Sequence, residues 1–488
     1  MTAVDAYAEL IRRSKELGLL NSCAAVLAWD QQTYMPTNGG GLRGNQMALL
    51  ATIEGSNVVA DPDSPEAANV RELRRAYDRS TKLPPALVAE LAQVTSEAQQ
   101  VWTVAKPKSD FATFRPWLEK VVALKRQEAD AVGFRDHPYD ALIEEYEPGT
   151  TVAELKTLFA GLTRDLVPLI RKIAESPKKP DRSVLEREYP VDRQKIFAEA
   201  AASAFGFDFG AGRLDTTAHP FCSGIGPGDC RITTRYNPRF FSESFFGVLH
   251  ETGHALYEQN LPAEHFGTPL GSACSFGIHE SQSRLWENQV GRGRPFWEHF
   301  FPRLKQTFPA ALRDVSLDTF YAAANDVRPS LIRVEADEAT YNLHIALRFE
   351  LELGLLTGDL PVVDLPGAWN ERMKALLGLD VPDHARGCLQ DIHWSFGGIG
   401  YFPTYTLGNL YAAQFMDAAR RDLGSDLEEG FRTGDFLPLK SWLTKHIHQH
   451  GQRFRAGELC RQATGGPLSS APLLSHLNEK YRVLYSVC

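Results

Sequence analysis

The stretch FFGVLHETGHALYEQ, residues 245–259, carries two histidines four residues apart, with a glutamate directly after the first. Residues four apart on an α-helix lie on one face about one turn apart, so His250 and His254 can place their imidazoles on one metal ion. Glu251 would flank that ion without displacing it, as suits a base that takes a proton from water. The pattern predicts a hydrolytic metal centre.

The residues around this motif are those of a buried helix. The apolar ones are Phe245, Phe246, Val248, Leu249, Ala255 and Leu256. Titratable side chains are costly in such a helix unless they are paired or bind a metal, and two core histidines held by hydrogen bonds are the alternative. Gly253 costs about 1 kcal/mol relative to alanine inside a helix. It indicates a close approach of backbone or substrate, or simple helix packing.

A third ligand has to come from another part of the chain. The segment GIHESQSRLWENQ, residues 277–289, offers Glu280 and Glu287 on a second predicted helix, with His279 beside the first. We favour Glu280, while Glu258 and His279 compete with it. Two imidazoles and one carboxylate leave a fourth position open for water, which is the arrangement that catalytic zinc needs.

A second pair of histidines four apart occurs in TKHIHQHGQRFR, residues 444–455. No acidic residue stands beside His446 and His450, and Gly451 follows them as a plausible helix stop. We interpret this basic segment as a solvated helix end and not as a second metal site.

The elements that must position these residues are mainly helices. A Thr151-x-x-Glu154 capping box precedes apolar residues at helical spacing. Similar patterns cover residues 4–20, 65–80, 84–105, 110–132, 296–314, 318–325, 330–356, 368–378 and 404–423. The exception is 217–236, where a Gly/Pro-rich turn predicts an antiparallel β-hairpin shortly before the histidine helix. No linker divides the chain, so we expect one catalytic domain over residues 1–488.

Composition limits the partners. The chain has 488 residues and a formal charge of −9, from 52 basic and 61 acidic residues, so it has no basic field for nucleic acid or an anionic membrane. The N-terminal segment has no cleavage site and no stretch of 18 apolar residues occurs, which favours a cytoplasmic location. Seven scattered cysteines without a C-x-x-C pair predict free thiols.

Further motifs stand in a fixed order between WDQQTYMP at 29–36 and IHQHG at 447–451. They are HPF at 219–221, DCRIT at 229–233, HETGH at 250–254, HESQ at 279–282, IRVEAD at 332–337 and GCLQDIHW at 387–394. In this order, over nearly the whole chain, the sequence resembles the Taq-type (thermostable) zinc metallocarboxypeptidase family.

The resemblance implies a mainly α, saddle-like fold with a deep groove, similar in architecture to neurolysin and angiotensin-converting enzyme, and a cytosolic homodimer. It also implies one Zn²⁺ per chain, replaceable by Co²⁺, held by His250, His254 and Glu280 with Glu251 as the base. Members of the family release single amino acids from the C-termini of peptides, with broad preference and against proline.

Such a reaction needs donors for the oxyanion that forms at the peptide carbonyl. We favour His393 and Tyr405 in QDIHWSFGGIGYFPTY, with Tyr401 as a rival. Aromatic residues are usually core residues, so each tyrosine also has a structural interpretation. His219 and Asp337 could orient metal ligands, and structural hydrogen bonds explain them equally well.

A carboxypeptidase must also bind a terminal carboxylate, for which arginine is the natural partner. Arg348 and Arg333 lie in apolar surroundings predicted to be helical, where each could instead form a structural ion pair. Arg231 on the hairpin is the third candidate, and it could pair with Asp229.

Two alternatives stand beside the carboxypeptidase hypothesis. An endo-oligopeptidase or aminopeptidase would use the same zinc chemistry, but an aminopeptidase would need carboxylates for the substrate ammonium. A non-catalytic helical protein would bind peptides without turnover and would have no need for Glu251.

Overall fold

The computed structural model describes residues 7–8, 10–12, 14–15 and 64–487. The chain forms two compact units, each assembled from separate stretches of sequence. The first unit comprises Met1–Tyr77, Pro180–Ala324 and Tyr411–Leu468, and the second comprises Asp78–Lys179, Asn325–Leu410 and Ser469–Cys488. The expected single catalytic domain stays a prediction. Most of the helix predicted at 4–20, and the whole motif at 29–36, lie outside the described residues.

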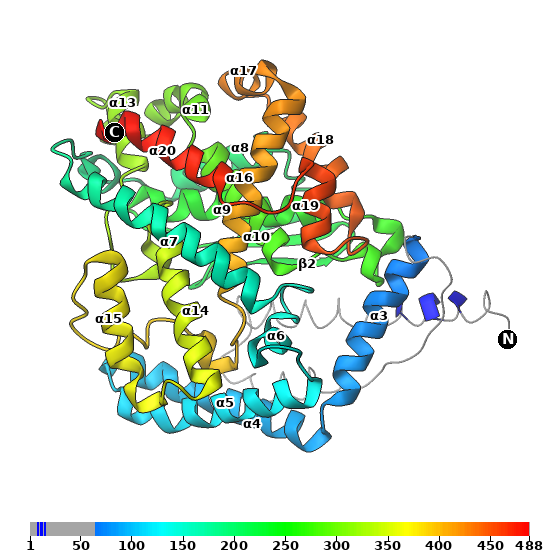
Figure 1. Ribbon diagram of the computed structural model, residues 1–488. Coiled ribbons are helices and arrows are strands. Elements are labelled where there is room, and N and C mark those ends of the chain that lie inside the picture. Colours follow the sequence, from blue (N-terminus) through cyan, green and yellow to red (C-terminus); the bar gives the residue numbers. More distant parts are fainter. Residues whose placement is uncertain (1–6, 9, 13, 16–63, 488) are drawn as a thin grey trace. The chain divides into compact units, whose positions relative to one another are not determined.

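The described part of the first unit is mainly helical and contains one small sheet (Figure 1). Its helices are α8 (Val191–Ala204), α9 (Phe241–Gln259), α10 (Phe276–Arg284), α11 (Arg294–Thr307), α12 (Pro309–Leu312), α13 (Leu317–Ala324), α17 (Ser425–Thr433), α18 (Leu437–His446) and α19 (Ala456–Thr464). A wider π-helical turn, Leu285–Gly291, continues α10. Helices α3 (Pro65–Lys82) and α16 (Pro403–Leu423) contribute residues to both units.

The sheet has the strand order β1-β3-β2. The predicted hairpin is confirmed: β2 (Cys222–Gly226) and β3 (Asp229–Thr234) are antiparallel, and Gly228 takes a φ of +82° in the turn between them. The sequence interpretation missed β1 (Gly212–Thr216), which pairs in parallel with β3. Of its five residues only Leu214 is buried, so β1 lacks an apolar alternation strong enough to predict a strand.

An aromatic core anchors α9. The rings of Phe241 and Phe245 on α9 stack 5.0 Å apart, and Phe245 contacts Trp297 of α11 at 5.4 Å. Phe197 of α8 closes the other side, 5.3 Å from Phe245. Burying each such side chain stabilises the fold by about 1.5–3 kcal/mol. The opposite face of α9 is therefore fixed in place and carries the histidines.

The described part of the second unit is built mainly from helices. They are α4 (Pro85–Ala105), α5 (Phe111–Val132), α6 (Pro138–Ile143), α7 (Val152–Glu175), α14 (Tyr341–Thr357), α15 (Leu365–Leu377) and α20 (Ala471–Tyr485). The capping box at α7 is confirmed, because the Thr151 hydroxyl accepts from the Glu154 amide and the Glu154 carboxylate accepts from Thr151. On α14, Phe349 packs against Phe159 of α7 with ring centroids 4.9 Å apart.

Four sequence expectations can be compared with these elements. The mainly helical fold is confirmed, but the helix predicted at 330–356 begins only at Tyr341, and Arg333 lies in a short 3₁₀ turn, Arg333–Glu335. Asp337 explains the break, because its carboxylate accepts the amides of Ala339 and Thr340 and so holds the turn that precedes α14. Within the described residues, five cysteines are free thiols and no helix is both long and apolar enough to cross a membrane.

Candidate metal centre

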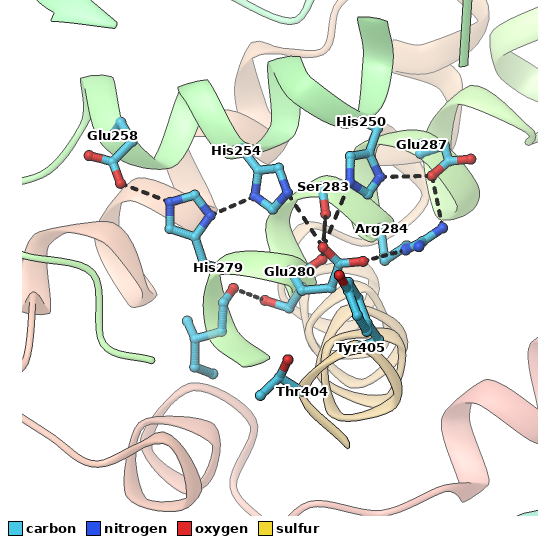
Figure 2. A network of polar contacts seen from close by, with 12 residues as sticks. His250, His254, Glu258, His279, Glu280, Ser283, Arg284, Glu287, Thr404 and Tyr405 are labelled. Atoms are coloured by element: carbon cyan, nitrogen blue, oxygen red, sulfur yellow. Dashed lines mark hydrogen bonds and ion pairs between the residues drawn. The ribbon is translucent and has the colours of Figure 1, made fainter. Parts of the chain in front are cut away.

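Helix α9 presents the two motif histidines on one face. Figure 2 shows His250 and His254 side by side on this helix, pointing toward Glu280 of α10. The two imidazole rings are 4.9 Å apart and meet edge to face. Glu251, the next residue along, is buried with only 6% of its surface exposed. The aromatic core on the opposite face fixes the direction in which these side chains project.

Glu280 completes a group of three ligand atoms. Its Oε2 lies 3.7 Å from His250 Nε2 and 3.4 Å from His254 Nε2, and the ligand atoms all lie within 4.8 Å of one another. Ligands about 2.0–2.1 Å from a tetrahedral ion stand about 3.3–3.4 Å apart, so the two contacts of Glu280 come close to the spacing of a zinc site. Among the described residues no other such group of histidine, cysteine and carboxylate side chains occurs. The competing candidates Glu258 and His279 lie outside the group.

A glycine allows α10 to approach α9. A Cβ added at Gly253 would stand 2.4 Å from the carbonyl oxygen of Gln282 and 2.6 Å from the Cα of Ser283. Both are backbone atoms, which cannot move aside without shifting α10. Gly253 therefore serves close helix packing, one of the interpretations that the sequence left open, and this packing brings Glu280 to the histidines.

Burial and charge favour the metal-binding forms of His254 and Glu280. Burial lowers the pKa of His254 to about 3, which keeps its imidazole neutral. Burial acts to raise the pKa of Glu280, but the Arg284 guanidinium and His250 outweigh it and hold that pKa far below its usual range. Burial raises the pKa of Glu251 to about 7, because its charged form loses solvation. A neutral imidazole and an ionised carboxylate are the forms that bind metal.

The nitrogen of each histidine that faces away from Glu280 also has a partner (Figure 2). His250 Nδ1 lies 3.0 Å from Glu287 Oε2, and Glu287 pairs in turn with Arg284 and Arg292. These partners fix the ring of His250 with Nε2 toward Glu280. The sequence interpretation weighed Glu287 only as a ligand, because its place behind His250 depends on the tertiary approach of α10.

In the second unit, Arg333 and Arg348 share one aspartate. Arg348 donates to Asp391 Oδ2 from Nε at 2.7 Å, and Arg333 donates to Asp391 Oδ1 from Nε at 2.9 Å. Arg348 is fully buried, with 0% of its surface exposed. These contacts are the structural ion pairs weighed from the sequence. Asp391 was not predicted, although it stands two residues before His393 in the motif.

His393 and Tyr405 lie together in the second unit. His393 Nε2 is 3.0 Å from the Tyr405 hydroxyl, and the ring of Tyr401 lies 5.2 Å from that of His393. Burial, reinforced by the charge of Arg333, lowers the pKa of His393 to about 3. The imidazole is therefore neutral at physiological pH, and it can share a proton with Tyr405.

The remaining candidate site residues are Arg231, His219 and Asp337, and none of them belongs to the group of three ligands. Arg231 on β3 donates to both oxygens of Asp229, at 2.8 and 2.7 Å, so the predicted pair forms. His219 is exposed in the loop before β2. Asp337, in the turn before α14, accepts four hydrogen bonds from Arg328, Ala339 and Thr340, so its contacts support its structural interpretation.

The second histidine pair does not form a metal site in the described chain. His446 ends α18 and stacks on Trp442 with ring centroids 4.6 Å apart, while His450 lies in the 3₁₀ turn His448–His450. The buried member of this segment is His448, whose Nε2 lies 2.9 Å from Gln282 Oε1.

We expect His448 to make the folded protein sensitive to acid. Burial lowers its pKa to about 3 from an unfolded value near 6.5, so its contribution to stability is present above pH 6.5 and is lost as the pH falls toward 3. We expect urea unfolding of His448→Phe to show a shallower decline over that range, by up to a few kcal/mol. A decline parallel to that of the unsubstituted protein would contradict this.

The helical fold, the small sheet beside α9 and the His250–His254–Glu280 group define a metallopeptidase. Residues 9–481 match the family model described as Carboxypeptidase Taq (M32) metallopeptidase. The chain belongs to this family and is a metallocarboxypeptidase. That assignment decides against the aminopeptidase, endo-oligopeptidase and non-catalytic alternatives.

Relatives and solved structures agree with this assignment. Thermostable carboxypeptidase 1 of Thermus thermophilus is 49% identical, over 99% of this chain and 100% of the relative, and carboxypeptidase 1 of Bacillus subtilis is 38% identical, over 96% and 97%. The crystal structure of the M32 carboxypeptidase from Deinococcus radiodurans R1 is 39% identical and matches with a TM-score of 0.95, covering 99% of this chain and 100% of that chain.

Proposed function

We propose that the protein is a zinc-dependent carboxypeptidase that releases single C-terminal amino acids from peptides, with broad specificity and against proline. The observation that carries this proposal is the group of two imidazoles and one carboxylate within 4.8 Å. Bound there, Zn²⁺, or Co²⁺ in its place, would act as a Lewis acid that acidifies water and polarises the peptide carbonyl. The specificity rests on the family resemblance.

Glu251 is the proposed general base. It follows a ligand on α9 and is buried, with its pKa raised to about 7. A carboxylate whose pKa lies near the working pH can accept a proton from water and then give it to the leaving amine. The three ligands would keep their charge states during the reaction, and only Glu251 would gain and lose a proton.

His393 and Tyr405 are the proposed donors to the oxyanion. Across their 3.0 Å contact a neutral His393 can donate Nε2–H to the Tyr405 oxygen, and the Tyr405 hydroxyl can then donate its own proton to a developing negative charge. Tyr401, with its ring 5.4 Å from that of Tyr405, is the alternative donor.

Arg231 is the candidate that we favour for the terminal carboxylate. Arg333 and Arg348 are buried and share Asp391, so binding a substrate there would break a buried charge network at a cost of several kcal/mol. The Arg231 side chain and its partner Asp229 are 19% and 39% exposed, so solvent reaches both groups. A carboxylate that exchanges with Asp229 would replace one bidentate ion pair by another.

Peptides with free and amidated C-termini test this choice. We expect Arg231→Ala to lower kcat/KM for free-carboxylate peptides about 10–100-fold, as fits the loss of a charged hydrogen bond, and to change little for amidated peptides. Arg213→Ala is the matched control, because Arg213 is the β1 neighbour of Arg231 and pairs with Asp215. Equal losses on both peptide types would make Arg231 structural, and the same measurements on Arg348→Ala would show whether Arg348 acts instead.

Metal analysis combined with mass spectrometry of a digested peptide tests the function itself. The zinc-loaded protein should produce a ladder shortened one residue at a time from the C-terminus, stalling at proline. Chelation should stop the reaction, and Zn²⁺ or Co²⁺ should restore it. Cleavage from the N-terminus, or full activity without metal, would refute the proposal.

We also propose a homodimer, a cytoplasmic location and one catalytic domain, all on the family resemblance or the sequence. Light scattering of the purified chain tests the first: a monomeric mass at micromolar concentration would refute it.

A further inference from the structure

His254 has a hydrogen-bonded chain of side chains behind it. Its Nδ1 lies 2.5 Å from Nδ1 of His279, and Nε2 of His279 lies 2.8 Å from Oε1 of Glu258 (Figure 2). The ring of Tyr257 packs 5.4 Å from that of His279. Neither His279 nor Glu258 belongs to the ligand group, so the proposed function leaves both without a role.

Hydrogen-bond chemistry allows one arrangement of protons along this chain. His254 must keep a lone pair on Nε2, the nitrogen that faces Glu280, so the proton of its neutral ring sits on Nδ1. That N–H donates to Nδ1 of His279, which must then be the bare nitrogen. His279 therefore carries its proton on Nε2 and donates it to the Glu258 carboxylate. One acceptor at the end of the chain fixes the tautomers of both rings.

Gly224 makes room for that acceptor. A Cβ at Gly224 on β2 would stand 2.1 Å from Oε2 of Glu258 and 2.6 Å from its Cδ. The carboxylate therefore rests directly against the sheet, at a position that an ordinary strand residue would occupy with its side chain. The obstructed atoms are the far end of a flexible side chain, so alanine at residue 224 would displace the carboxylate while leaving the backbone in place.

We propose that Gly224, Glu258 and His279 form a positioning relay that holds His254 in the tautomer and orientation that bind the metal. The inference rests on the proposed function, since it assumes that His254 is a ligand. The relay residues touch neither substrate nor metal. They act through His254, and their effect is on metal affinity before any chemistry occurs.

The dissociation constant for Zn²⁺, measured on the full chain by competition with a chromophoric chelator, tests the relay. We expect Gly224→Ala and Glu258→Met to raise it about 10–100-fold, the usual effect of losing a partner behind a ligand. The melting temperature of the metal-free protein should stay within about 2 °C, because the fold does not depend on these contacts. Gly457→Ala, where a Cβ meets nothing within 4 Å, is the control and should leave the dissociation constant for Zn²⁺ unchanged.

Substitutions of His279 add a graded readout. His279→Phe keeps a ring and removes both nitrogens, so it should weaken Zn²⁺ binding most. His279→Asn keeps an acceptor in the place of Nδ1 and loses the link to Glu258, so it should fall between His279→Phe and the unsubstituted protein. If His279→Phe fails to fold, the Gly224 and Glu258 variants decide.

These measurements distinguish a failure of the relay proposal from a failure of the proposed function. Unsubstituted affinity in both Gly224→Ala and Glu258→Met would overturn the relay while the metal site stands. An unsubstituted protein that does not bind Zn²⁺, or that binds it equally well as His254→Ala, would overturn the proposed function itself.

Discussion

Replacing Glu251 by glutamine should lower kcat by about 10²–10⁴-fold and leave Zn²⁺ binding intact. The amide has the shape of the carboxyl group but cannot accept a proton from water. Glu251 is not among the three ligand residues, so the metal should stay bound. Steady-state hydrolysis of a peptide with a free C-terminus and the metal content of the same preparation measure the two effects.

The matched control is Glu243→Gln, on the same helix and paired with Arg235. It should keep full activity. Hydrolysis by Glu251→Gln at the unsubstituted rate would remove Glu251 from the role of base. Loss of metal together with activity would make it a structural part of the site.

Glu251→Gln, which should lower activity, should raise the stability of the folded protein at alkaline pH. Burial raises the pKa of Glu251 to about 7 in the folded protein, above the unfolded value of 4.5. The stability that its protonated form contributes is therefore lost as the pH rises through 7. In chelator-treated protein at pH 8, Glu251→Gln should be more stable than the unsubstituted chain.

Gly253→Ala should have the second large effect, a loss of both stability and metal. The added Cβ meets backbone of α10 at 2.4 Å, so the two helices must separate. Overpacking of this kind costs about 1–3 kcal/mol, which outweighs the gain of about 1 kcal/mol from replacing glycine inside a helix. Because α10 carries Glu280, its displacement should also raise the dissociation constant for Zn²⁺.

Gly161→Ala provides the comparison for this experiment. Gly161 lies inside α7, where a Cβ meets nothing within 4 Å. It should gain stability from helix propensity and leave metal affinity unchanged. A Gly253→Ala protein with normal melting temperature and normal affinity would show that α10 does not depend on this close approach.

The ligands on α9 could be predicted from the sequence because helical spacing alone puts His250 and His254 on one face. Glu280 could only be favoured, since its approach depends on the packing of α10 at Gly253. The family resemblance favoured Glu280 over Glu258 and His279 as the third ligand. The grouping of Glu280 with the two histidines agrees with that choice.

What the sequence did not reveal depends on contacts between distant residues. The relay from His254 to Glu258 requires α9, α10 and β2 to meet, and no spacing rule connects those segments. Asp391 was overlooked because pattern reasoning weighed Arg333 and Arg348 separately, and a shared partner is visible only after folding. The strand β1 was missed because a parallel pairing has no turn signal.

The division of the chain has a consequence for its synthesis. The unit that holds the metal ligands is completed by Tyr411–Leu468, whose Phe436 packs on Phe205 and on Phe296 of α11. A ribosome delivers α9 and α10 long before it delivers those residues. We therefore expect the apolar faces of the ligand helices to stay incompletely covered during translation, and the metal site to be completed only near the end of elongation.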